Sequence, residues 1–189
     1  MYYPIVTRLT ELRNMAGQFE VVPYSETWPK TFQALKARLE PALGALCRRI
    51  EHVGSTSVPG LPAKPVIDID VVIEEDDQLE DVIERLAAIG YAFEGDKGVP
   101  GRYAFASPPG LPDHHLYVCA EDAPELRRHL LFRDYLRRHP EEAAGYGELK
   151  RRLAKENPVD RVAYTDGKTG WIERALGMAR HETLPTSTR

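Results

Sequence analysis

The sequence contains little cysteine and no long apolar segment. Its two cysteines, Cys47 and Cys119, match no metal-binding or redox spacing. This scarcity excludes a cysteine-based metal or dithiol motif and indicates a reducing compartment. No segment is long and apolar enough to cross a membrane, and the first 18 residues do not have the shape of a signal peptide. We therefore expect a cytoplasmic protein without a membrane partner.

A large excess of charge is also absent. The formal net charge is −4, with 42% hydrophobic and 29% charged residues, which is ordinary for a globular chain. This balance excludes a protein that binds nucleic acid or membrane over its whole surface, although a local basic patch is compatible with it. The 189 residues suffice for one domain with a single core. We place this domain at residues 19–180, after a leader at 1–18 and before a polar tail at 181–189.

Hydrophobic spacing indicates a mixture of helices and strands. The sequence predicts helices at residues 26–46, 76–89, 124–138, 140–156 and 159–180. It predicts strands at residues 48–53, 65–73, 91–94, 102–106 and 114–119. The first two thirds of the chain thus combine both kinds of element, and the last third is helical. This layout predicts an α+β fold with a mixed β-sheet, flanking helices and a C-terminal helical segment.

The predicted strand PVIDIDVVI carries two carboxylates. Side chains alternate between the faces of a strand, and one face is wholly apolar and must belong to the core: Ile67, Ile69, Val71 and Ile73. The other face carries Asp68 and Asp70, which repel each other unless a partner neutralises them. A divalent cation, Mg²⁺ or Mn²⁺, is such a partner because it prefers oxygen ligands. Taken alone, the pattern is equally consistent with a solvated edge strand whose aspartates pair with lysines.

A glycine-led turn, HVGSTS, precedes this strand. Gly54 permits a tight turn and a close approach of the backbone to a ligand. The hydroxyl and N–H groups of Ser55 and Thr56 suit a phosphate oxygen. Most Gly-Ser pairs are plain turns. The turn and the two aspartates together favour a site for phosphoryl transfer, where a cation and phosphate-binding groups position the reactants.

Several stretches of the chain resemble the GrpB family, a group of small bacterial proteins assigned to the nucleotidyltransferase superfamily. They are VPYSETWP, EHVGSTSVPGLPAKPVIDI, GVPGRYAF, HHLYV, HLLFRDYLRRHPEEAAGYGELKRRLA and AYTDGKTGWI, and they span about residues 19–178. The resemblance implies a polymerase-β-like nucleotidyltransferase fold. It also implies that Gly54 and Ser55 bind a nucleoside triphosphate and that Asp68 and Asp70 bind metal.

The predicted strand that begins at His114 departs from what this resemblance implies. Active members of the superfamily usually have a third carboxylate on a later strand, often the residue that activates the attacking hydroxyl. Here the corresponding face carries His115 and Tyr117, and the nearby acids Asp113 and Glu94 lie outside it. His115 is therefore a candidate base or metal ligand in place of the acid. The family commonly has a histidine at the position of Tyr117. Its replacement by tyrosine here makes a metal site built from three histidines a weaker prediction.

Further polar residues are candidates for the same pocket. They are His52, Lys64, Arg102, Tyr117, Arg133, Lys150, Tyr164 and Lys168. The basic side chains among them suit the negative charge of a phosphate chain, and Arg102 suits a substrate clamp. Each kind has an alternative role, His52 as a structural part of the turn and the basic residues as ordinary solvated side chains.

These residues lead to three hypotheses. The first is a Mg²⁺-dependent nucleotidyltransferase that moves a nucleoside monophosphate from an NTP to an unknown small-molecule or protein acceptor. The second is a non-catalytic protein that binds a nucleotide or phosphometabolite on the same fold, which the missing third carboxylate favours. The third is a small metal-dependent hydrolase or a histidine-centred metal site that uses His52 and His115.

Overall fold

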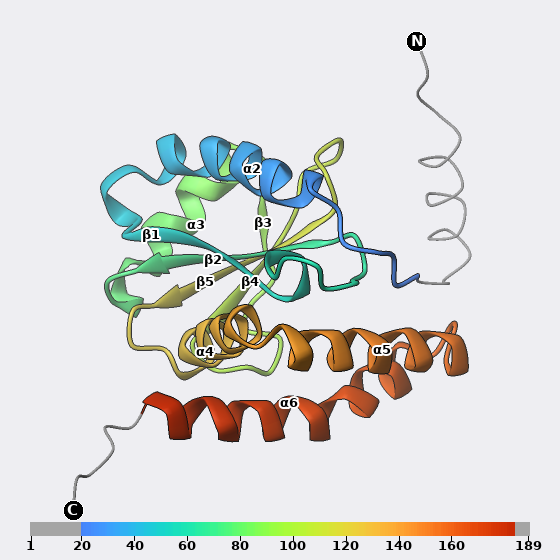
Figure 1. Ribbon diagram of the computed structural model, residues 1–189. Coiled ribbons are helices and arrows are strands. Elements are labelled where there is room, and N and C mark those ends of the chain that lie inside the picture. Colours follow the sequence, from blue (N-terminus) through green and yellow to red (C-terminus); the bar gives the residue numbers. More distant parts are fainter. Residues whose placement is uncertain (1–19, 184–189) are drawn as a thin grey trace, which may run out of the picture.

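A five-stranded mixed sheet forms the centre of the molecule, whose computed structural model describes residues 20–183 (Figure 1). Its strands are β1 (Arg49–Val53), β2 (Ile67–Ile73), β3 (Ala92–Phe93), β4 (Arg102–Ala106) and β5 (His114–Ala120). Their order across the sheet is β1-β2-β5-β4-β3. The pair β2–β5 is parallel, and the other neighbouring pairs are antiparallel. The predicted leader at residues 1–18 lies outside the described residues.

The pairing of β2 with β5 determines which polar side chains meet. Asp68 lies opposite His115, and Asp70 lies opposite Tyr117. Side chains at paired positions of neighbouring strands point to the same face of a sheet. The two aspartates, the histidine and the tyrosine therefore share one face near the middle of the sheet.

Helices α2 (Thr27–Leu43) and α3 (Leu79–Ala88) cover the opposite face, which is uppermost in Figure 1. Apolar residues recur in α2 at helical spacing and are buried: Phe32, Leu35, Leu39 and Leu43. With Val82 and Leu86 of α3, they pack in one core with the apolar side chains of β2, Ile67, Ile69, Val71 and Ile73. The predicted core face of this strand is thus confirmed.

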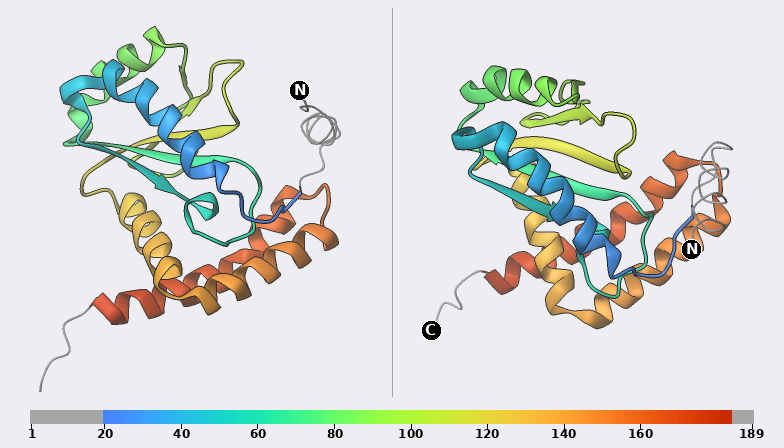
Figure 2. Two further views of the ribbon diagram at one scale, coloured as in Figure 1. Left: turned by 45° about the horizontal axis from the view of Figure 1, so that its top comes forward. Right: turned by 90° about the horizontal axis from the view of Figure 1, so that it is seen from above.

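Three helices lie on the aspartate side of the sheet. They are α4 (Pro124–Arg138), α5 (Pro140–Glu156) and α6 (Arg161–Thr183). Figure 1 shows them below the sheet, and both views of Figure 2 show α5 and α6 side by side. Near the start of α4, Leu126 packs with Val72 and Cys119 from the sheet. The rings of Tyr146 and Trp171 stack with 4.5 Å between their centroids, which joins α5 to α6.

The predicted α+β fold is confirmed, and most element boundaries agree with the predicted ones. Both α4 and α5 begin at a proline, which the first turn of a helix tolerates because its N–H groups have no intrahelical acceptor. Strand β3 is shorter than predicted, because the structure leaves Tyr91 and Glu94 outside it. Tyr91 precedes the strand and is buried in the core. Helix α6 continues through Thr183, so the first residues of the predicted polar tail are helical.

Short 3₁₀ turns join several of these elements. They are η1 (Gly44–Leu46), η2 (Ser55–Ser57) and η3 (Asp76–Gln78). The turn η2 lies directly between β1 and the segment that leads into β2, so it places the predicted phosphate-binding residues beside the central strands. Within residues 20–183, no helix is both long enough and apolar enough to span a membrane.

Candidate active site

A cavity of about 430 Å³ is lined by residues of the sheet, the turn η2 and the helices α5 and α6. The predicted site residues in its wall are Ser55, Thr56, Lys64, Asp68, His115, Tyr117, Lys150, Tyr164 and Lys168. They come from segments that are far apart in the sequence. The fold therefore gathers most of the residues predicted from local patterns at one place.

The turn at Gly54 presses against Asp68. Gly54 has a φ of +66°, which side chains disfavour. A Cβ atom at this position would lie 2.1 Å from Oδ2 of Asp68, so only glycine fits beside the carboxylate. The hydroxyl of Ser57 donates a hydrogen bond of 2.6 Å to the carbonyl of Gly54 and closes the turn. The glycine predicted for a close backbone approach thus lies directly against a predicted metal ligand.

Asp68 is held by the neighbouring strand. Nδ1 of His115 lies 2.9 Å from Oδ1 of Asp68. This hydrogen bond raises the pKa of His115 above its usual value, although burial works in the opposite direction. Through Nδ1, His115 therefore orients the aspartate, which leaves only its second nitrogen for the predicted role of base or ligand.

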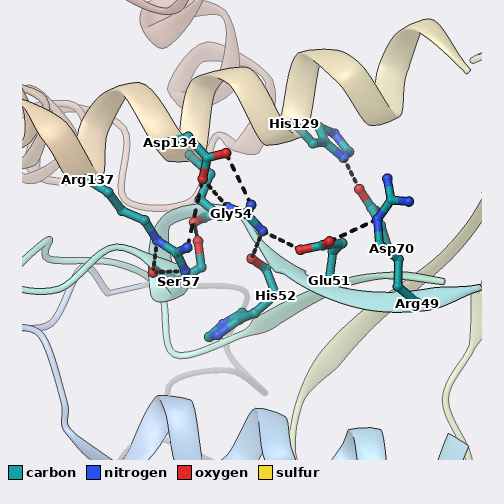
Figure 3. Close-up of polar contacts among 10 residues, drawn as sticks. Arg49, Glu51, His52, Gly54, Ser57, Asp70, His129, Asp134 and Arg137 are labelled. Atoms are coloured by element: carbon teal, nitrogen blue, oxygen red, sulfur yellow. Dashed lines mark hydrogen bonds and ion pairs between the residues drawn. The ribbon is translucent and has the colours of Figure 1, made fainter. Parts of the chain in front are cut away.

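Asp70 is completely buried and pairs with His129 of α4 (Figure 3). Nδ1 of His129 lies 2.7 Å from Oδ2 of Asp70, and Nε2 of His129 lies 3.2 Å from Oε1 of Glu125. Burial lowers the pKa of His129, but the hydrogen bonds to the two carboxylates outweigh burial and raise this pKa to about 9. Burial raises the pKa of Asp70, and the bond from His129 opposes that change.

Three lysines, Lys64, Lys150 and Lys168, line the cavity. Burial and the charge of Lys168 lower the pKa of Lys150 to about 7 and that of Lys64 to about 8. Nζ of Lys150 is buried, has no hydrogen-bond partner among the described residues and lies 4.7 Å from the ring centroid of Tyr146. The ammonium groups of Lys64 and Lys168 lie 4.4 and 4.3 Å from the ring centroid of Tyr164. This wall suits a negatively charged ligand.

Arg133 lies outside the cavity wall and joins α4 to β1. Its guanidinium donates to Glu51 and Asp134, each at 2.7 Å, and to the backbone carbonyl of His52 at 3.2 Å; Figure 3 labels these partners. One helical turn later, Arg137 donates to the last carbonyl of η2 at 2.9 and 3.1 Å. The two arginines therefore hold the backbone on both sides of Gly54, at His52 and Ser57. The structure does not bring Arg133 to the predicted phosphate site, because Arg133 does not line the cavity.

His52 and Arg102 do not line the cavity either. The ring of His52 stacks on Phe32 with 4.7 Å between centroids, and its Nε2 lies 3.0 Å from Oγ1 of Thr56. Burial lowers the pKa of His52 to about 4, so the ring is neutral and supports the turn. The hydroxyl of Thr56 donates to a backbone carbonyl at 3.2 Å, which leaves its main-chain N–H as the group for a phosphate. The guanidinium of Arg102 lies 4.4 Å above the ring of Tyr117.

One carboxylate oxygen of the two aspartates is buried, lacks a hydrogen-bond partner within residues 20–183 and could bind a cation. Oδ1 of Asp70 is buried and has no hydrogen-bond partner among the described residues, although buried carboxylate oxygens normally have one. Asp68 lies on the same strand face and lines the cavity. Within residues 20–183, no group of three or more His, Cys, Asp or Glu side chains is placed to hold a metal ion. The structure also separates His52 from His115, since His52 lines a different cavity.

Glu125 and His129 are not among the site residues predicted from the sequence, although their spacing indicates that they act as a pair. The two residues are four apart at the start of a predicted helix, so they share one helix face. The helix follows β5 after a short loop, which brings its first turns close to the paired strand β2. Periodicity does not say which helix face meets the aspartates, and only the packing of α4 decides this.

Comparison with known proteins identifies the family. Residues 18–177 match the family model described as GrpB protein. The chain belongs to the GrpB family. It is 37% identical over 156 residues to the UPF0157 protein YqkA of Bacillus subtilis, a match that covers 82% of the chain but 46% of YqkA, so the chain spans about half of that relative. It is 33% identical over 168 residues to the glutamate-rich protein GrpB of Alkalihalophilus pseudofirmus, covering 85% of the chain and 95% of the relative.

Solved structures with the same architecture confirm the predicted fold. The crystal structure of the conserved protein GrpB from Enterococcus faecalis has a TM-score of 0.78 and 34% identity, over 86% of this chain and 98% of that one. A structure of the Cid1 poly(U) polymerase has a TM-score of 0.54 and 14% identity, over 86% of this chain and 55% of that one. At such low identity, the likeness to Cid1 concerns the fold alone. The chain described here thus has the polymerase-β-like nucleotidyltransferase fold.

Proposed function

We propose that this GrpB-family protein is a Mg²⁺-dependent nucleotidyltransferase that moves a nucleoside monophosphate from an NTP to a small-molecule or protein acceptor. The observation that carries the proposal is the composition of the 430 Å³ cavity, where Asp68, the turn after Gly54 and three lysines face one volume. Its size suits a small ligand, and its opposite charges suit a metal-bound phosphate chain. The Cid1 structure with the same fold is described as bound to MgATP.

The lysines supply the phosphate side of the proposed site. Lys64, Lys150 and Lys168 are less basic than free lysine because burial disfavours their charged forms and Lys168 repels the other two. A triphosphate bound among them would remove the mutual repulsion and give the buried Nζ of Lys150 a partner. The N–H groups of Ser55 and Thr56 would bind the same phosphates.

The aspartates supply the metal side. Asp68 and Asp70 would hold Mg²⁺, or Mn²⁺ in its place, and phosphate oxygens and water would complete its ligands, as is usual for Mg²⁺. The bound cation would neutralise negative charge on the phosphates. In this arrangement, His115 orients Asp68 through their hydrogen bond, and Gly54, which has no side chain, leaves room for the carboxylate of Asp68.

Label transfer tests the proposed activity. The protein is incubated with each α-labelled NTP, Mg²⁺, and pooled metabolites or proteins as acceptors. We expect transfer of label by the wild type, loss of transfer by Asp68→Ala, and normal transfer by Asp77→Ala, whose aspartate is exposed on η3. No transfer from any NTP, or equal transfer by Asp68→Ala, contradicts the proposal.

A non-catalytic nucleotide-binding protein is the second candidate. It is favoured because, within residues 20–183, no third carboxylate or histidine joins Asp68 and Asp70 in a group placed to hold a metal ion. Titration calorimetry followed by chromatography of the recovered nucleotide separates the two candidates. Tight binding of NTP that is recovered unchanged after incubation with acceptors supports the second candidate, whereas conversion supports the first.

A further inference from the structure

Each of the two aspartates on β2 is held by one histidine on one oxygen. His115 bonds Oδ1 of Asp68 at 2.9 Å, and His129 bonds Oδ2 of Asp70 at 2.7 Å. The remaining oxygen of Asp70 is buried without a hydrogen-bond partner among the described residues, and the remaining oxygen of Asp68 lies against Gly54. A histidine is therefore paired with each carboxylate, and the second oxygen of Asp70 is left for another partner.

The second of these histidines is itself fixed. Nε2 of His129 lies 3.2 Å from Glu125, one turn earlier on α4, while Nδ1 faces Asp70. Both ring nitrogens thus face carboxylate oxygens, and rotation of the ring would remove both contacts. The side chains of His129 and Glu125 are each only 20% exposed, which limits competition from water. Helix α4 thus sets the orientation of a carboxylate on β2.

We propose that His129, held by Glu125, is a positioning residue that turns the second oxygen of Asp70 toward a divalent cation shared with Asp68. The inference rests on the cation site of the proposed function. Outer groups of this kind orient metal-binding carboxylates, and their removal weakens metal affinity. If His129 occupied the place of the cation instead, the buried Oδ1 of Asp70 would still have no partner among residues 20–183, although buried polar atoms normally have one. A cation at this oxygen removes that difficulty.

Mn²⁺ binding measured by electron paramagnetic resonance tests this role without reference to activity. We expect His129→Leu to weaken Mn²⁺ affinity about 10- to 100-fold. His129→Asn should stay within about threefold of the wild type, because its amide nitrogen can replace Nδ1 as the donor to Asp70. Glu125→Gln should lie between them. His181→Leu, on the exposed face of α6, is the matched control. ATP affinity without metal should not change in any variant.

The outcomes separate this inference from the proposed function. Unchanged Mn²⁺ affinity in His129→Leu overturns the positioning role, and increased affinity overturns it by showing that His129 competes with the cation. If His129→Leu also loses metal-free ATP binding, His129→Asn decides: recovery of both affinities supports the role, and continued loss overturns it. Absence of Mn²⁺ binding by the wild type overturns both this inference and the cation site on which it rests.

Discussion

Strand β2 has an apolar face and a carboxylate face, and burial acts on them in opposite ways. The apolar side chains lie beneath α2 and α3, and Ile69 among them is completely buried. Burying such hydrocarbon stabilises the fold by roughly 0.8 kcal/mol per methylene group. On the other face, Asp70 is equally buried, and Lys150 of α5 on the same side of the sheet is nearly so. Burial of charged groups destabilises a fold unless partners compensate it. One face therefore stabilises the domain, and the other is kept despite its cost.

The difference between the faces lies in the charged groups that each of them buries. The cavity lysines Lys64 and Lys150 and the buried Asp70 have unusual pKa values, because burial disfavours their charged forms. Beneath α2 and α3 the described core holds no buried lysine or carboxylate, and His52, which stacks on Phe32, is neutral because burial lowers its pKa to about 4. Substitutions should consequently separate the two faces: changes to the apolar face should alter stability, and changes to the cavity wall should alter ligand binding.

The largest effect on stability is expected on the apolar face. Ile69→Ala removes a completely buried side chain and should lower the free energy of unfolding by about 2–5 kcal/mol. Because Ile69 points away from the cavity, ATP affinity at temperatures where the variant is folded should match that of the wild type. Urea unfolding and calorimetry measure the two quantities. A small loss of stability together with weakened ATP binding would remove the distinction between the faces.

Gly54→Ala should affect both stability and binding. The added methyl group would meet Oδ2 of Asp68 at 2.1 Å and would also be strained at positive φ, a cost of about 1–3 kcal/mol. We expect weaker binding of both Mn²⁺ and ATP, since Asp68 must move. Gly60→Ala is the control: its φ is +77°, but its Cβ would have no neighbour within 4 Å. Equal Mn²⁺ affinities in the two variants would show that contact with Asp68 is unimportant.

Lys150→Met should have the opposite effect on stability. Methionine has a similar shape and no buried charge, so we expect a gain of about 1–3 kcal/mol and a loss of roughly tenfold or more in ATP affinity. The pKa of Lys150 is about 7 in the folded protein and near 10.5 in the unfolded chain. Between these values the unfolded chain binds more protons, so wild-type stability rises with pH. The gain from Lys150→Met should therefore be greatest below pH 7, decrease between pH 7 and 10.5, and disappear above pH 10.5.

The control for this variant is Lys155→Met, on an exposed position of the same helix. It should change neither the free energy of unfolding by more than about 0.5 kcal/mol nor ATP affinity. Destabilisation by Lys150→Met would show that the buried ammonium is compensated by partners.

The sequence predicted the features that depend on local order. The two faces of β2 follow from strict alternation, and the place of Gly54 before this strand follows from the need for a tight turn. Helices α4 and α5 have the predicted bounds because prolines mark their first turns. The match of the chain to GrpB sequences confirms the family to which these motifs were assigned.

The sequence did not predict which charged residues of the helices reach the site. The sequence predicts both Arg133 and Lys150 as phosphate-binding residues, yet Lys150 lines the cavity while Arg133 pairs with Glu51 on β1. His129, which holds Asp70, is not among the predicted site residues. Hydrophobic spacing gives the apolar stripe of a helix, but its rotation against the sheet depends on contacts between distant segments. These three side chains are therefore placed only by the packed structure.

The smallest predicted effect is the pH dependence of ATP binding without metal. A phosphate chain favours the charged forms of Lys64 and Lys150, whose pKa values in the free protein are about 8 and about 7. Binding should therefore take up protons, and ATP affinity should fall about three- to tenfold as the pH rises from 7 to 9. Calorimetry in buffers with different ionisation enthalpies measures the proton uptake. In Lys150→Met the uptake should be smaller, because only Lys64 and Lys168 remain to gain protons. Release of protons, or an affinity that increases with pH, would mean that the phosphates bind away from these lysines and that the cavity face is not specialised for anions.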